Sequence, residues 1–454
     1  MANEVSVEST AGGRFESILT NFEYSLQGYR LFLAQLHGQI KDSYQGELEA
    51  RMGRIVDKLE PKDRDSVVEG FDSFIEFVGS SIEEETAAKG DENESDKSGF
   101  SVEFSSESSS RAFAKMFEFI MRAGWIGPDA QLERLYRSVI IGLVGQFEVL
   151  IADIAHQFFK CAPQALDADE KVLSLSDLQD FGSVEAALDY LVEREIDKLL
   201  AQPVQGWAKF FDSRMDIQLR RMAWDWGIFK EIIQRRHIIV HTDGRISRRY
   251  LQYVSPELVK EYFGEEAKIG QTTRLDRDYV ETALDHLESL GTLLCCTAWV
   301  KLDKQSLDQF EDTLSAWIYD QLLEGRWTMA LTMAQEGENS KKLSHSTQLV
   351  CRANAWLCLK RIGRFDEVKE EVEEFDDSAL ENRFRFARLA ILDREEELCD
   401  LLEANEGGGL DHQAWHEWPI FSEIRENPRF AELAERFGPK PKSTVADDSP
   451  GEAA

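Results

Sequence analysis

Residues 229–244 read FKEIIQRRHIIVHTDG, a stretch that predicts a helix ending in a glycine. Its apolar residues recur at helical spacing, and Gly244 stands where a left-handed residue commonly ends a helix. These apolar residues are Phe229, Ile232, Ile233 and Val240. Arg236 falls on the same stripe, where burial of a guanidinium requires a counter-charge or a bound anion. The pattern therefore predicts a specific partner for Arg236.

Two histidines end this helix. His237 and His241 are one turn apart, about 40° around the helix axis, whereas Arg236 and His241 are separated by about 140°. An arginine can hold a phosphodiester, and a histidine can move a proton near neutral pH. A single straight helix points Arg236 and His241 in different directions. We therefore expect the helix to end at His241, or a second copy of the chain to complete the site.

The charge of the chain is strongly uneven. Residues 214–249 hold nine basic and four acidic side chains, a net charge of +5, while the whole chain carries −33 and the remainder therefore −38. General affinity for nucleic acids needs a broad basic surface, which this composition excludes. A local basic segment in an acidic protein can still hold one anion.

The rest of the sequence predicts an all-α fold. No run alternates with a period of two residues, and apolar residues instead recur at helical spacing. The expected helices cover Phe15–Ile40, Asp65–Ile82, Arg111–Phe159 (as one or two helices) and Arg274–Lys301. Ser183 and Ser255 stand where helix-capping residues are expected, the latter followed by Pro256 in the first turn.

The chain divides into two helical regions and a tail. Residues 1–302 form the first, with a flexible acidic and serine-rich insertion at about 83–110. In residues 303–438, helical pairs recur around three turns, near Gly325, Gly363 and Asp393. This second region resembles tetratricopeptide-type repeats, which implies a surface for a protein partner. Residues 439–454 are expected to be disordered.

Several features favour a cytoplasmic protein. The N-terminus lacks a secretory signal pattern, and the apolar segment Val139–Phe159 is interrupted by polar residues, so we expect a buried helix instead of a membrane span. The six cysteines form no CxxC pair and are expected to be reduced core residues. No motif in the sequence calls for a metal ion or another cofactor.

The spacing around Arg236 resembles the motif of the HEPN family, all-α domains with an arginine, four to six residues, and then a histidine. Arg236 is followed by the polar His237, and His241 comes after four intervening residues. The resemblance implies a metal-independent endoribonuclease that acts as a dimer and leaves 2′,3′-cyclic phosphate ends. Arg236 would bind the scissile phosphate, His241 would act as general acid or base, and His237 would orient the phosphate or the other histidine.

The candidates for binding the phosphates of the RNA substrate are Arg235, Arg245, Arg248 and Arg249. Family analogy also implies a toxin or antiviral effector whose helical repeats control its activity. The alternative is a non-catalytic dimeric scaffold of the same HEPN and TPR-like architecture. Arginine and histidine near a helix C-terminus also interact favourably with the helix dipole without any further role.

Overall fold

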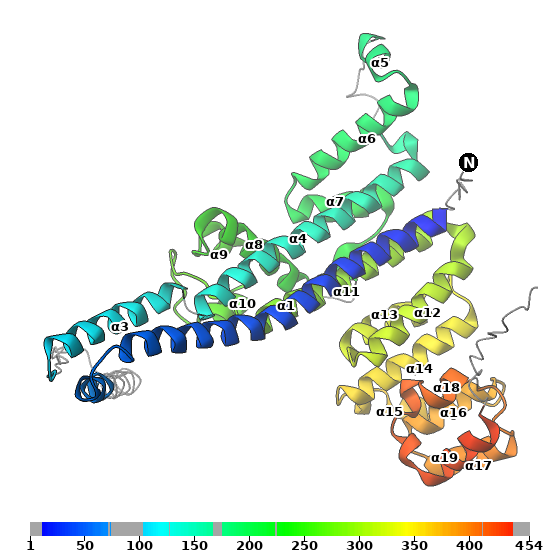
Figure 1. The fold of residues 1–454 in the computed structure, drawn as a ribbon. Coiled ribbons are helices and arrows are strands. Elements are labelled where there is room, and N and C mark those ends of the chain that lie inside the picture. Colours follow the sequence, from blue (N-terminus) through cyan, green and yellow to red (C-terminus); the bar gives the residue numbers. More distant parts are fainter. Residues whose placement is uncertain are drawn as a thin grey trace, which may run out of the picture.

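A computed structural model describes residues 11–70, 73, 103–126, 128–166, 175–222, 225–410 and 412–438. Within these residues the chain is built of helices, and the only β-type pairing is an isolated bridge between Arg245 and Thr272. The predicted all-α fold class is confirmed (Figure 1). The expected disordered tail, residues 439–454, lies outside the described residues.

The N-terminal region contains the longest helices. They are α1 (Ala11–Val56), α3 (Glu107–Ile126), α4 (Pro128–Cys161), α5 (Leu175–Phe181), α6 (Val184–Leu200), α7 (Val204–Met215), α8 (Trp226–Thr242), α9 (Arg248–Tyr253), α10 (Pro256–Phe263) and α11 (Arg277–Leu302). Ser183 and Ser255 accept backbone N–H bonds at the starts of α6 and α10, as predicted. The expected flexible insertion is wrong for residues 107–110, because they form the first turn of α3 and Ser109 is fully buried.

Three long helices, α1, α4 and α11, form the centre of this region (Figure 1). The rings of Phe22 and Phe147 meet edge to face between α1 and α4, and Phe15 stacks on Trp299 between α1 and α11. Gly291 allows this packing, because a Cβ there would collide with Phe22. Helix α8 packs across α4 and α11, so its position is set by the most buried part of the molecule.

Helix α4 is long and apolar enough to cross a membrane by length and composition. Half of its most apolar window is buried inside the protein, against the neighbouring helices. Five of the six cysteines are buried free thiols, whereas Cys161 at the end of α4 is exposed. The expectation that all six belong to the core is therefore wrong for Cys161.

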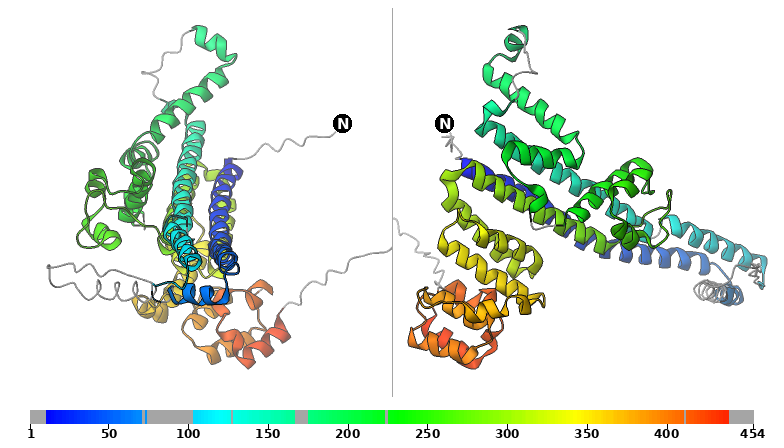
Figure 2. Two further views of the ribbon diagram at one scale, coloured as in Figure 1. Left: turned by 60° about the vertical axis from the view of Figure 1, so that its left-hand side comes forward. Right: turned by 180° about the vertical axis from the view of Figure 1, so that it is seen from behind.

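The C-terminal helices gather in a lobe to one side of the long helices (Figure 2). They are α12 (Leu307–Leu323), α13 (Trp327–Asn339), α14 (His345–Arg361), α15 (Lys369–Glu374), α16 (Asn382–Ile391), α17 (Glu395–Ala404), α18 (His412–His416) and α19 (Pro428–Phe437). Helix α11 ends at Leu302, and the hydrophobic core continues without interruption from α1 into these helices.

The three predicted turns in this lobe share one backbone geometry. Gly325, Gly363 and Asp393 all adopt positive φ angles, of 71°, 75° and 56°. In each turn the next N–H donates to a carbonyl five residues earlier. These bonds are Arg326 to Gln321 (2.9 Å), Arg364 to Leu359 (2.8 Å) and Arg394 to Leu389 (2.9 Å). This hydrogen bond closes a helix in a Schellman-type end and starts the next helix after it.

A partly buried ion cluster around Glu288 joins the lobe to the long helices. Arg30 of α1 contacts Asp285 and Glu288 of α11, each at 2.6 Å, and Arg326 contacts Glu288 at 2.8 Å. Glu23 lies in the same cluster, and its Oε1 atom is buried without a hydrogen-bond partner. The position of the lobe is therefore fixed by charge pairing as well as by apolar packing.

Candidate functional site

Both ends of α8 are fixed by specific contacts. At the start, Asp225 Oδ1 accepts the N–H groups of Gly227 (2.7 Å) and Ile228 (3.1 Å). At the end, Gly244 has a φ of +73°, and its N–H donates to Ile238 at 2.9 Å. The predicted glycine cap is confirmed, although Asp243 also adopts a left-handed conformation, with a φ of 52°. The orientation of each side chain on α8 is thereby set.

The buried side of α8 holds an ion pair between Arg235 and Glu231. Arg235 is 1% exposed and Glu231 is fully buried, and the arginine Nε donates to Glu231 Oε1 at 2.7 Å. The carboxylate also accepts hydroxyl bonds from Tyr250 (2.5 Å) and Tyr279 (2.7 Å). Burial raises the pKa of both tyrosines, so their hydroxyls remain protonated donors. Both oxygens of Glu231 are thus satisfied.

Aromatic rings surround the Arg235 guanidinium. Its Cζ atom lies 4.6 Å from the centre of the Tyr279 ring and 4.8 Å from that of Phe263, within the range of cation–π attraction. Thr273 accepts a further bond from Nη1 at 2.5 Å. The predicted role of Arg235 in substrate binding does not fit this placement, because the side chain is enclosed and its donors are already used.

The prediction that Arg236 lies at the centre of the buried face is wrong. Arg235 takes that position, because Glu231, four residues earlier on the same face, supplies the counter-charge inside the protein. Arg236 is only half-buried, and its Nε atom is enclosed without a hydrogen-bond partner. No carboxylate in the described part of the chain forms an ion pair with it. Arg236 therefore remains available for an anion that comes from outside.

The two histidines of the motif lie against one another. The ring centres of His237 and His241 are 4.4 Å apart, with 49° between the ring planes. Burial lowers the pKa of His237, and the positive charge of Arg249 lowers it further, followed by His241 and Arg236. His237 is therefore mostly neutral at neutral pH and can accept a proton. His241 is exposed at the surface.

The remaining arginines that were predicted to bind the substrate differ in their position relative to His237 and His241. Arg249 is exposed, lies 5.6 Å above the Tyr253 ring, and its charge acts on His237. Arg245 and Arg248 are also exposed, and among the described residues no contact connects their side chains to His237. The structure thus brings Arg236, His237, His241 and Arg249 together, and leaves Arg235 outside the group.

Sequence reasoning missed the supporting residues of this site. Glu231 and Arg235 are four residues apart, a spacing typical of an ion pair on a helix, and this spacing could have indicated the pair from the sequence. Nothing local could show that Tyr279, 48 residues after Glu231, completes the network. Among the described residues, no three histidine, cysteine, aspartate or glutamate side chains gather closely enough to hold a metal ion.

Comparison with protein-family models, with curated proteins and with solved structures finds no match to this chain.

Proposed function

We propose that this protein is a metal-independent endoribonuclease of the HEPN type that acts as a dimer. The observation that carries the proposal is the unpaired Arg236 beside the contacting pair His237 and His241. A half-buried guanidinium that forms no ion pair with a carboxylate of the described residues suits a phosphate that arrives with the substrate. The two imidazoles beside it supply groups that exchange protons near neutral pH.

The proposed reaction needs a base and an acid. A neutral imidazole removes the proton from the ribose 2′-hydroxyl, whose oxygen attacks the phosphorus. The bond from phosphorus to the 5′-oxygen breaks, and a protonated imidazole donates a proton to that leaving oxygen. Arg236 binds the non-bridging oxygens, where negative charge develops. The products are a 2′,3′-cyclic phosphate and a free 5′-hydroxyl.

The lowered pKa of His237 suits the base, and the exposed His241 suits the group that reaches the leaving oxygen. This assignment gives His237 a larger role than orienting the phosphate. Arg249 supports it, because a nearby cation favours the neutral imidazole of His237.

A second copy of the chain is part of the proposal. Arg236 and His241 project about 140° apart on one helix, so a single copy does not aim both at one phosphate. Val240, which lies between them in sequence, is 46% exposed. Further apolar side chains are exposed on α4, which packs against α8, and on α1, which packs against α4. These are Tyr24, Leu31, Phe32, Ile141 and Val149.

The test is cleavage of a fluorescently labelled single-stranded RNA in the presence of EDTA. We expect product ends that carry 2′,3′-cyclic phosphate, and a loss of about 10²-fold or more in rate for His241→Ala and for Arg236→Ala. Lys160→Ala, at an exposed position at the end of α4, is the matched control and should keep full activity. Equal rates for all four proteins would contradict the proposal.

The alternative is a dimeric scaffold without catalysis. It is favoured by the divergence of Arg236 and His241 within one chain, which leaves a single copy without a complete site. In that case the wild type is inert towards RNA, yet light scattering still finds a dimer that Val240→Glu disrupts. On either proposal, helices α12–α19 would receive a protein partner and link this region to a cellular trigger.

A further inference from the structure

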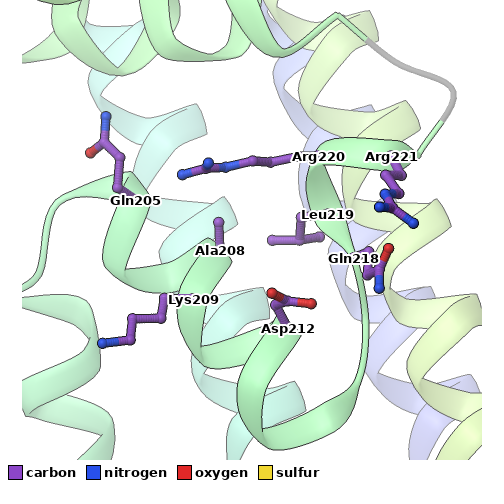
Figure 3. A pocket seen from close by; sticks show the side chains of 8 residues that line it. All are labelled: Gln205, Ala208, Lys209, Asp212, Gln218, Leu219, Arg220 and Arg221. Carbon is purple, nitrogen blue, oxygen red and sulfur yellow. The ribbon is translucent and has the colours of Figure 1, made fainter.

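A basic hollow lies between α7 and the short 3₁₀ turn η2 (Leu219–Arg221), away from the histidines. Its volume is about 450 Å³, and Ala208 and Leu219 form a buried apolar floor. Lys209, Arg220 and Arg221 line its rim (Figure 3). It precedes α8, whereas the Arg236–His241 motif ends that helix, so about 15 Å or more of helix separates the two sites.

The rim of this hollow is electropositive in a protein of net charge −33. Lys209, Arg220 and Arg221 supply three positive charges, against one carboxylate from Asp212. In the described residues none of the three cations forms an ion pair with a carboxylate. The other basic side chains of the chain include many that are paired, such as Arg30, whereas these three are available to a ligand.

The polypeptide around the hollow is held in place before any ligand binds. Helix α7 ends at Met215 and is capped by Asp216, which has a left-handed φ of 52° and an ion pair with Lys301 at 2.6 Å. The N–H of Ile217 donates to Phe211 at 2.9 Å, which turns the chain back towards α7. Leu219 is buried, so the two arginines that follow it must project outward.

Arg220 is the best-placed cation. Its side chain extends across the hollow towards Gln205 (Figure 3). Its guanidinium lies 5.9 Å from the centre of the Trp226 ring, which supports one face of the group and leaves its edge donors free. An arginine fork of this kind matches the paired oxygens of a phosphate.

We propose that this hollow binds a phosphate-bearing ligand of nucleotide size. The volume falls within the range of small-molecule sites, and the apolar floor can receive a planar base. Arg220 and Lys209 bind the phosphates, whereas Asp212 and the amide of Gln205 accept from or donate to the ribose and the base. Arg221, whose guanidinium lies on the other side of Leu219, adds positive charge at the rim (Figure 3). The inference does not depend on ribonuclease activity, because it uses none of the residues of the Arg236 group.

The experiment measures binding by isothermal titration calorimetry at about 0.15 M salt, where exposed charge pairs are already screened. The probes are ATP, AMP, inorganic phosphate and a short single-stranded RNA without terminal phosphates. We expect saturable binding of at least one of the two nucleotides, and an affinity at least tenfold lower for Arg220→Ala/Arg221→Ala. His241→Ala and Lys160→Ala should bind as the wild type does.

The inference is overturned by no saturable binding of either nucleotide, by equal affinity of the double variant, or by inorganic phosphate bound as tightly as the nucleotides. Binding of the RNA without binding of either nucleotide also contradicts the inference, since the rim would then bind a nucleic-acid strand. Thermal melting monitors the fold of the double variant, and Lys209→Ala provides a milder change at the same rim. Loss of nucleotide binding with intact RNA cleavage separates this site from the proposed function.

Discussion

Two neighbouring arginines of α8 meet opposite environments. Arg235 is 1% exposed, pairs with Glu231 and contacts four aromatic rings. Arg236 is half-buried, with an enclosed Nε and no carboxylate partner among the described residues. One residue of helix turns the side chain by about 100°, and this rotation separates a structural charge from a free one.

The contrast shows that an arginine on a partly apolar helix is not by itself a binding residue. A buried charge that already has its partners holds the protein together, whereas a charge that lacks one can bind a ligand. The same distinction separates Arg30 and Arg326, which share Glu288, from Arg220 and Arg221 at the rim of the basic hollow.

The largest effect is expected when the buried pair is broken. Arg235→Ala leaves the Glu231 carboxylate enclosed without its counter-charge, and we expect a loss of about 3–5 kcal/mol in the free energy of unfolding. Arg236→Ala is the matched control, one residue away, and should change stability by less than about 1 kcal/mol. Urea unfolding followed by circular dichroism measures both. Similar losses of stability for the two variants would show that Arg235 and Arg236 do not differ in their structural role.

A smaller loss is expected when one donor to Glu231 is removed. Tyr279→Phe keeps the ring packing but leaves Glu231 Oε2 without its hydroxyl donor, which should cost about 1–3 kcal/mol. Tyr24→Phe, at a side chain that is 73% exposed, should have no measurable effect. Equal unfolding midpoints in urea for Tyr279→Phe and the wild type would show that this bond contributes nothing.

The Glu23 carboxyl is largely enclosed, and its Oε1 atom has no hydrogen-bond partner. Burial, and then the negative charge of Glu288, raises the pKa of Glu23 to about 8, with Asp320 acting in the same direction and Arg326 against it. The folded protein therefore holds a proton that the unfolded chain releases near 4.5. The stability from this group is complete below about 4.5 and is lost as the pH rises through about 8.

We expect Glu23→Gln to remove that loss, so that the variant is more stable than the wild type at pH 9 and nearly equal to it at pH 5. Urea unfolding at the two pH values measures the difference. Glu435→Gln, at an exposed position of α19, controls for the change in net charge. A constant difference between wild type and Glu23→Gln at both pH values would contradict the assignment.

The smallest effect concerns His237 on the outward side of α8. Its lowered pKa predicts an imidazole that titrates below the ordinary value of about 6.5, first because of burial and then because of Arg249. Protonation is disfavoured in the folded state, so the stability from this group is complete above about 6.5 and falls as the pH drops further. Arg249→Ala should raise the midpoint in an NMR titration of the ring, while Arg248→Ala leaves it unchanged.

Much of the local structure could be predicted from the sequence. The spacing of apolar residues predicted α8 and α11, and Ser183, Ser255 and Gly244 predicted where helices begin or end. These features depend on backbone geometry and on neighbours within one turn. The turns at Gly325, Gly363 and Asp393 were predicted for the same reason.

The face that each charged residue occupies could not be predicted in the same way. The apolar residues near Arg236 suggested burial, yet Arg235 is the buried arginine because α9, α10 and α11 bring tyrosines to its side of α8, and the loop before α11 brings Thr273. The basic hollow was also missed, although Arg220 and Arg221 belong to the basic segment. Its walls come from α7 and η2, and the sequence pattern did not show that these are two separate elements.

The sequence by itself determined that the chain is helical, where several of its helices end, and which arginines and histidines stand near the end of α8. Only the tertiary structure decided which of these side chains is enclosed and which is free. The physical reason is that periodicity fixes the direction of a side chain relative to its own helix, whereas burial and charge pairing depend on residues far away in sequence. Arg235 and Arg236 show that difference although they are adjacent in the sequence.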